Sequence, residues 1–165
     1  MENIYVERVR ANVKRQALYC DMLGSARWVG ELAQRYPARE ITPLTPWFAN
    51  ISIHDVEITG CSTLVDVSAL PEKPVKNFFF GNVKAHCDRI GKICDATKFS
   101  MKDVRIESCD TVMRIDNCDY ASFFGFSNVT TGSSVKIEKT GGECRYLNVQ
   151  TYPLVPVNYQ SIRPG

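Results

Sequence analysis

The chain has 165 residues, the length of one domain, and 44% of them are hydrophobic, which is enough to build a core. With 20 basic and 18 acidic residues and a net charge of +2, it carries no block of one sign that would predict binding to nucleic acid or to an anionic membrane. No apolar run is long enough to span a membrane, and the first residues contain no signal-peptide pattern.

One short phrase, with apolar residues spaced 2, 3 and 2 apart, recurs six times along the chain. The third position of each copy is a valine: Val9, Val56, Val83, Val104, Val129 and Val149. After the first interval of 47 residues, these valines follow one another at intervals of 20 to 27 residues. A period of this size is typical of a solenoid, in which each repeat buries its apolar face against a neighbour.

Each copy is predicted to form two short strands joined by a bend. Alternation of apolar and polar residues on both sides of the bend has the period of a strand. The residue before the valine is Asn or Asp in five copies, and these types tolerate the left-handed backbone of a tight corner: Asp55, Asn82, Asp103, Asn128 and Asn148. A second apolar run follows most copies, as in Leu64 to Val67. The sequence therefore predicts an all-β parallel β-helix of about six coils, with a sandwich or jelly roll as the alternative.

The long first interval predicts an insertion at residues 23–46. Residues 25–36 have helical spacing, with Trp28 and Leu32 on one face, and prolines follow at Pro37, Pro43 and Pro46. We therefore expect one domain over residues 1–165, with a short helical insertion and an irregular tail at residues 152–165.

Seven cysteines are present, and three of them follow a repeat valine by four or five residues: Cys61, Cys87 and Cys109. We expect them to stack as a buried ladder of small side chains. No spacing typical of a zinc site is present, so no metal site and no cofactor are predicted.

Three stretches resemble the C-terminal coils of the polygalacturonase family of glycoside hydrolases (family 28): residues 1–22, the phrase Asn-Ile-Ser-Ile-His-Asp-Val-Glu-Ile-Thr-Gly at 50–60, and Pro-Val-Lys-Asn-Phe-Phe-Phe-Gly-Asn-Val at 74–83. The resemblance implies a right-handed β-helix and an extracellular or periplasmic location. It also implies hydrolysis of galacturonan-type linkages with inversion, for which two carboxyl groups must admit a water molecule between them.

The family's catalytic motifs are missing from this chain. The nearest sequences are Arg114-Ile115-Asp116, in place of Arg-Ile-Lys, and Cys109-Asp110, in place of Asp-Asp. No residue is therefore assigned a catalytic role, and we interpret the chain as the C-terminal part of such an enzyme, inactive alone. The remaining acids are expected at corners or in solvent: Asp66, Asp95, Asp110, Asp116 and Asp119. His54 and His86 are interpreted as lone structural histidines.

Substrate contact is predicted at the insertion and the coil before it. Trp28 could stack on a sugar ring, and Arg15 and Arg27, with Arg35, could pair with a uronate carboxylate of a galacturonan-like polysaccharide or oligosaccharide. The alternative interpretation of Trp28 is that it docks its helix on the solenoid. The alternative function is a non-catalytic carbohydrate-binding or structural β-helix module.

Overall fold

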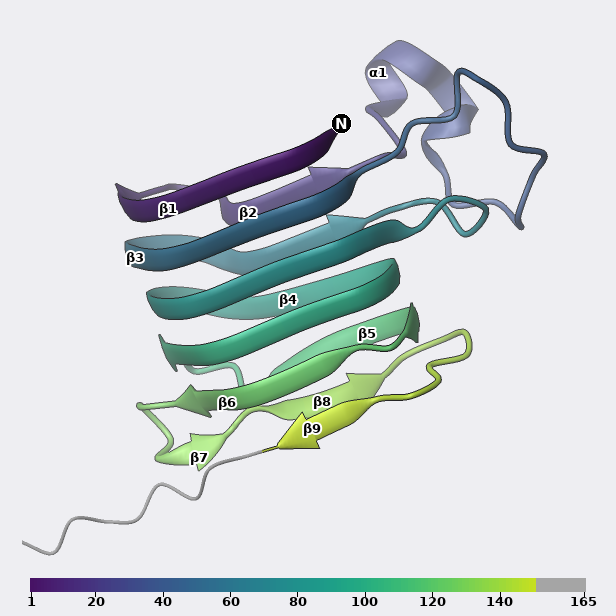
Figure 1. Cartoon of the computed structure of the whole chain (residues 1–165). Helices are drawn as coiled ribbons and strands as arrows, with labels where there is room; N and C mark the ends of the chain where they lie inside the picture. The colour runs from purple at the N-terminus through teal and green to yellow at the C-terminus, as the bar shows by residue number, and fades with distance from the viewer. Residues whose placement is uncertain (151–165) are drawn as a thin grey trace, which may run out of the picture.

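The computed structural model describes residues 1–150, apart from the side chain of Leu32, as a solenoid of parallel strands (Figure 1). The all-β parallel β-helix predicted from the repeat phrase is confirmed. The coils complete about four turns with partial coils at both ends, and the prediction of about six includes those partial coils. The predicted irregular tail at residues 152–165 lies outside the described residues.

The elements in chain order are β1 (Glu2–Asn12), β2 (Gln16–Asp21), α1 (Ala26–Val29), the 3₁₀ helix η1 (Gly30–Ala33), β3 (Ala49–Ser68), β4 (Val75–Glu107), β5 (Val112–Asp119), β6 (Ser122–Asn128), β7 (Ser133–Ser134), β8 (Lys136–Lys139) and β9 (Asn148–Gln150). β3 and β4 are long because each continues around the corners of a coil, and β4 also continues into the next coil.

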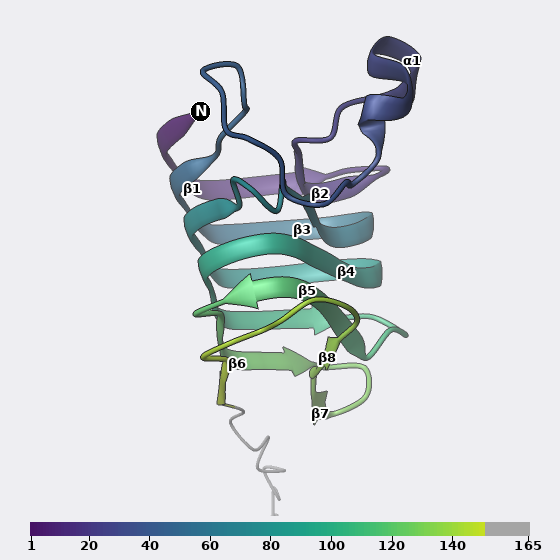
Figure 2. The ribbon, with the colours of Figure 1, turned by 90° about the vertical axis from the view of Figure 1, so that its right-hand side faces the viewer.

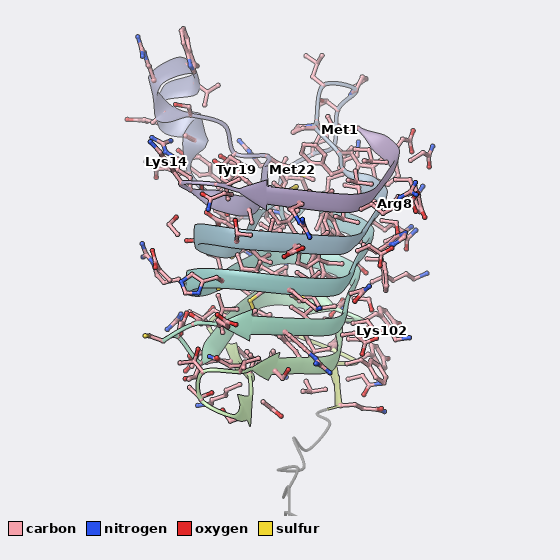
Figure 3. The ribbon with its side chains drawn as sticks, turned by 90° about the vertical axis from the view of Figure 1, so that its left-hand side faces the viewer. Met1, Arg8, Lys14, Tyr19, Met22 and Lys102 are labelled. Atoms are coloured by element: carbon pink, nitrogen blue, oxygen red, sulfur yellow. The ribbon has the colours of Figure 1, made fainter. Side chains whose placement is uncertain are left out.

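Each coil has three strand segments, which define three faces of the solenoid. The front face of Figure 1 contains residues 2–8, 49–55, 76–82, 98–103, 121–125 and 148–150. The side face follows at residues 9–12, 56–60, 83–87, 104–107 and 126–128, and Figure 3 looks onto it. The rear face contains residues 16–21, 63–68, 89–95, 112–117 and 136–139. Adjacent coils pair in parallel register on all three faces.

The corner between front and side faces consists of residues with left-handed backbone. The predicted corners Asp55, Asn82 and Asp103 have φ of 56°, 48° and 53°, and Arg8 has φ 55°. Nδ2 of Asn82 donates a hydrogen bond to Oδ1 of Asp55 at 2.5 Å, so neighbouring corners are also joined by their side chains. The prediction of left-handed Asx corners is confirmed at these three positions.

A second column of left-handed residues, which the sequence analysis did not identify, lies at the start of the front face. Its members are Asn3, Asn50, Asn77, Lys98, Tyr120 and Tyr146. The side-chain amide of Asn50 donates to Asn3 at 3.0 Å, and that of Asn77 donates to Asn50 at 2.8 Å. This amide ladder joins the first three coils.

The predicted alignment is wrong in the last two coils. Val104 pairs with Phe126 and Met101 with Phe123, so the fifth phrase begins at Ala121, three residues earlier than predicted. Gly125, with φ 62°, provides the corner there, while Asn128 is buried opposite Ile106. Val129 is exposed. In the sixth copy Val149 pairs with Phe123, which places it at the second position of the phrase.

The reason for the error is that consecutive phenylalanines satisfy two registers. The first two apolar positions of the phrase can be filled by Ala121 and Phe123 or by Phe124 and Phe126. The two alignments differ by an odd number of residues, so a change from one to the other exchanges the buried and the exposed side chains. A glycine can adopt left-handed backbone at least cost, so Gly125 fixes the corner and with it the register.

The core lies inside the coils and consists of stacked columns of apolar side chains. Phe78 and Phe99 come from successive coils, and their rings stack with centroids 4.9 Å apart. Val56, Val83 and Val104 form the next buried column. Burial of each such side chain contributes about 1.5–3 kcal/mol, so the stacking of one coil on the next holds the solenoid together.

The predicted cysteine ladder is correct for two of its three members. Cys61 pairs with Cys87 in register, and both are buried. The third position is occupied by Ser108, whose hydroxyl donates to the carbonyl oxygen of Asp88 at 3.2 Å. Cys109 is exposed, because it follows the buried Ser108 and its side chain points to the opposite side of the chain.

The insertion contains less helix than predicted. Ser25 caps α1 by accepting a hydrogen bond from the backbone N–H of Arg27, and Gly30, with φ 58°, ends it after one turn. Figure 2 shows α1 beyond the N-terminal end of the solenoid. No helix in residues 1–150 has both the length and the apolar character needed to cross a membrane.

Candidate functional site

The rear face presents a column of outward side chains on successive coils. The strand register places Tyr19, Asp66, Lys92, Arg114 and Glu138 in one line. Lys92 and Arg114 are exposed and lie on adjacent strands, which are separated by about 4.8 Å. Their side chains therefore lie next to each other on the outer surface of the rear face.

A shallow groove of about 220 Å³ surrounds these two residues and also includes Arg89, Thr63 and Gly91. Gly91 has φ 104°, and a Cβ at this position would overlap the carbonyl oxygen of Val65 on the neighbouring coil. Gly91 thus contributes backbone alone to the groove, beside the cationic side chains of Arg89, Lys92 and Arg114.

The two carboxylates that line the groove are already engaged by the protein. Asp110 accepts hydrogen bonds from the backbone N–H groups of Ile90 and Val112 at 3.0 and 3.2 Å. Asp66 accepts one from Nε2 of Gln16 at 3.4 Å. With three cations against two carboxylates, the groove has a net positive charge and favours an anionic ligand.

The side face, by comparison, alternates in charge. Its two larger depressions are lined by Arg10, Glu57, Lys84, Arg105 and Glu107 among others. Arg10 forms an ion pair with Glu57 at 2.7 Å. Figure 3 shows this face, with Arg8 at one edge and Lys14 at the other. The five residues named here have the same balance of three cations and two carboxylates as the rear groove, but Arg10 is already paired with Glu57, whereas no ion pair is described for Arg89, Lys92 or Arg114 in residues 1–150.

Two of the predicted binding residues contact each other. The guanidinium carbon of Arg27 lies 5.3 Å from the centre of the Trp28 ring, and Trp28 is 79% exposed. The interpretation of Trp28 as the residue that docks the helix is therefore wrong. Its ring is available to stack on a ligand.

Arg15 and Arg35 are placed differently. Arg15 is exposed at the turn from the side face to the rear face, where its carbonyl oxygen accepts the N–H of Ser62 at 2.9 Å. None of the contacts described for Arg15 reaches Trp28. Arg35 forms two hydrogen bonds with Asp95, at 2.6 and 2.8 Å, so its guanidinium is committed to an internal ion pair.

The other acidic residues considered from the sequence have structural partners. Asp95 is fully buried at a left-handed corner, with φ 60°, as expected for a corner residue. Asp116 accepts the backbone N–H of Gly142 at 2.9 Å. Asp119 pairs with Arg145 at 2.6 Å, and the hydrogen bond from Arg145 holds the pKa of this carboxyl below its usual value. All three carboxylates are thus held by partners within the protein.

A cluster on the front face was missed by the sequence analysis, which treated His54 as a lone histidine. Its ring contacts Asp55 on one side and Tyr5 on the other, and Glu7 lies in the neighbouring coil opposite His54. The signal was present in the repeat: alignment of Val9 with Val56 places Glu7 beside His54.

No family model, curated protein or solved structure matched this chain.

Proposed function

We propose that this chain binds an acidic, galacturonan-like polysaccharide along its rear face, as the non-catalytic β-solenoid part of a polygalacturonase-like glycoside hydrolase. The observation that carries the proposal is the row of Arg89, Lys92 and Arg114 around one groove on an exposed face of stacked strands. The proposal includes the extracellular or periplasmic location that the resemblance to this family implies.

The chemistry of the groove supports a uronate ligand. An arginine can bind a carboxylate through two parallel hydrogen bonds, and a lysine adds a point charge beside it. Arg114 belongs to the Arg-Ile-Asp sequence, which keeps the arginine of the family's substrate-binding Arg-Ile-Lys but has Asp116 in place of its lysine. It projects outward while Ile115 is buried, as the strand alternation predicts. Arg27 and Trp28 offer a second cation and a sugar-stacking surface on the insertion.

Binding without cleavage is expected, because Asp95, Asp110, Asp116 and Asp119 are held by internal partners. De-esterified polygalacturonate should retard the protein in affinity electrophoresis, and the retardation should weaken as salt is raised. No new reducing ends should appear in the same mixture.

The test compares two matched double variants. Lys92→Ala/Arg114→Ala should weaken binding by at least tenfold, because a hydrogen bond to a charged group contributes about 1.5–3 kcal/mol and 1.4 kcal/mol is tenfold. Lys84→Ala/Arg105→Ala removes the same two cation types from the side face and should leave binding unchanged. Trp28→Ala should weaken binding.

Two results would contradict the proposal: equal loss in both double variants, or equal affinity for polygalacturonate and for a neutral glucan. A free-standing carbohydrate-binding module is the second candidate. It is favoured by the exposed Trp28 ring and predicts that Trp28→Ala causes the larger loss.

A further inference from the structure

A separate site lies on the front face, on β1 and β3, whereas the cationic groove lies on the rear face. Tyr5 and Glu7 are alternate residues of β1 and therefore point to the same side of the strand. His54 of β3 is paired with Glu7 in the strand register. The three side chains thus converge outside the sheet, on two neighbouring coils.

Three polar atoms of this cluster form a compact triangle. Nε2 of His54 lies 2.6 Å from the hydroxyl oxygen of Tyr5 and 3.9 Å from Oε2 of Glu7. The Tyr5 hydroxyl lies 3.0 Å from the same Oε2. The ligands of a tetrahedral Zn²⁺ ion, with bonds of about 2.0–2.2 Å, are about 3.4 Å apart, and the three separations lie on either side of this value. Binding of one ion therefore needs Nε2 and the Tyr5 oxygen to move apart and Nε2 and Oε2 to move closer, which is a change in the side chains and not in the backbone.

Each converging side chain is also held in place by a neighbour. Nδ1 of His54 is 2.9 Å from Oδ2 of Asp55, which leaves Nε2 as the nitrogen that faces Tyr5 and Glu7. Asp55 in turn accepts the side-chain amide of Asn82 at 2.5 Å. Metal-binding histidines usually donate their second N–H to a carboxylate in this manner, which fixes the tautomer and the ring orientation.

The remaining contacts add to this arrangement. Nη2 of Arg8 donates to Oε1 of Glu7 at 2.7 Å, so the second oxygen, Oε2, stays with the cluster. The rings of Tyr5 and His54 meet edge to face with centroids 5.1 Å apart. The local charges are two carboxylates and one guanidinium, which leaves a net attraction for a cation.

From this geometry we infer that Tyr5, Glu7 and His54 form a binding site for one divalent transition-metal ion of the Zn²⁺ type, oriented through Asp55. A nitrogen and two oxygens suit Zn²⁺, and three protein ligands leave a position open to solvent. The Tyr5 hydroxyl loses its proton to solvent when the metal binds. This inference does not depend on the proposed polysaccharide function.

The experiment is isothermal titration of the tag-free chain with Zn²⁺ under reducing conditions, in a Cys109→Ser background that removes the exposed thiol as a competing ligand. One Zn²⁺ per chain is expected. His54→Ala should abolish this binding, and His86→Ala should leave it unchanged. The two variants are matched because the chain contains only these two histidines.

Conservative variants test the geometry itself. Tyr5→Phe removes the oxygen but keeps the ring against His54, and it should weaken binding. Asparagine has nearly the same shape as aspartate and also tolerates left-handed backbone, so Asp55→Asn should preserve the corner. It should weaken Zn²⁺ binding by about 10–100-fold, the usual effect of losing a group that orients a metal ligand. In the ¹⁵N spectrum Zn²⁺ should shift Nε2 of His54 and leave the nitrogens of His86 in place.

Three results would overturn the inference: no stoichiometric binding at millimolar Zn²⁺, undiminished binding by His54→Ala with a native circular dichroism spectrum, or full affinity in both Tyr5→Phe and Asp55→Asn. None of these results bears on polygalacturonate binding, so failure here is separable from failure of the proposed function.

Discussion

Arg35 holds the carboxylate of Asp95 through two hydrogen bonds, Nε to Oδ2 at 2.6 Å and Nη2 to Oδ1 at 2.8 Å, across 60 residues of sequence. Asp95 is fully buried, and Nδ2 of Asn117 donates to its Oδ1 at 2.6 Å. The hydrogen bond to Asp95 raises the pKa of Arg35 above its usual value. This ion pair anchors the middle of the insertion to the solenoid.

The two partners of this pair should respond unequally to substitution. Arg35→Ala leaves a buried carboxylate without its counter-ion and should lower the free energy of unfolding by about 3–4 kcal/mol. Asp95→Asn leaves an arginine whose side chain is 39% exposed and can turn into solvent, so it should cost only about 1–2 kcal/mol. Urea denaturation measures both, and Arg35→Ala should also speed proteolysis within residues 23–46.

Arg145→Ala is the control for this comparison, because it removes an exposed ion pair with Asp119 and should change the stability little. The double variant Arg35→Ala/Asp95→Asn should be more stable than Arg35→Ala, since no charge is then left buried. A larger loss for Asp95→Asn than for Arg35→Ala would contradict this account.

Gly91 should not tolerate a side chain. An alanine there needs φ near 104° and would overlap the carbonyl oxygen of Val65, so Gly91→Ala should lower the free energy of unfolding by about 3–5 kcal/mol or prevent folding. Gly132 also has positive φ, 63°, but its Cβ would meet open space, so Gly132→Ala should cost only about 1–2 kcal/mol. Equal losses in urea denaturation would show that backbone overlap is not the cause.

Cys109 should react before the other thiols. It is the exposed cysteine among the seven, and burial raises the pKa of Cys20 to about 11 and that of Cys118 to about 12. Only a thiolate reacts, so a disulfide reagent at pH 8 should label one thiol per native chain rapidly. Cys109→Ser should remove this fast phase, and its persistence in the variant would refute the assignment.

Asp119 should titrate at lower pH than an ordinary aspartate, because Arg145 donates to its charged form. A carboxyl with a lowered pKa in the folded state stabilises the fold above its unfolded pKa, and this contribution disappears as the pH falls through the folded value. NMR titration of the side-chain carboxyl carbon should show the lowered pKa in the wild type and a normal one in Arg145→Ala. The same midpoint in both proteins would count against the ion pair.

Much of the fold follows from the sequence because its determinants are local. Asp55, Asn82 and Asp103 were identified as corners from residue type and position alone, since the left-handed backbone depends on a residue and its neighbours. The buried valines Val56, Val83 and Val104 follow from the same phrase. The site was less predictable: Arg27 and Trp28 meet because they are adjacent, whereas Lys92 and Arg114 become neighbours only through pairing of β4 with β5.

The sequence by itself determined that this chain winds into stacked parallel coils with Asx corners, since alternation and backbone preference are encoded within a few residues. Tertiary structure decided the register of the fifth and sixth coils, where Phe123, Phe124 and Phe126 allow two alignments and Gly125 selected one. It also decided which polar groups meet, as with Arg35 and Asp95 or Glu7 and His54. Such contacts join residues tens of positions apart, so they depend on how the coils stack, which residue types alone do not specify.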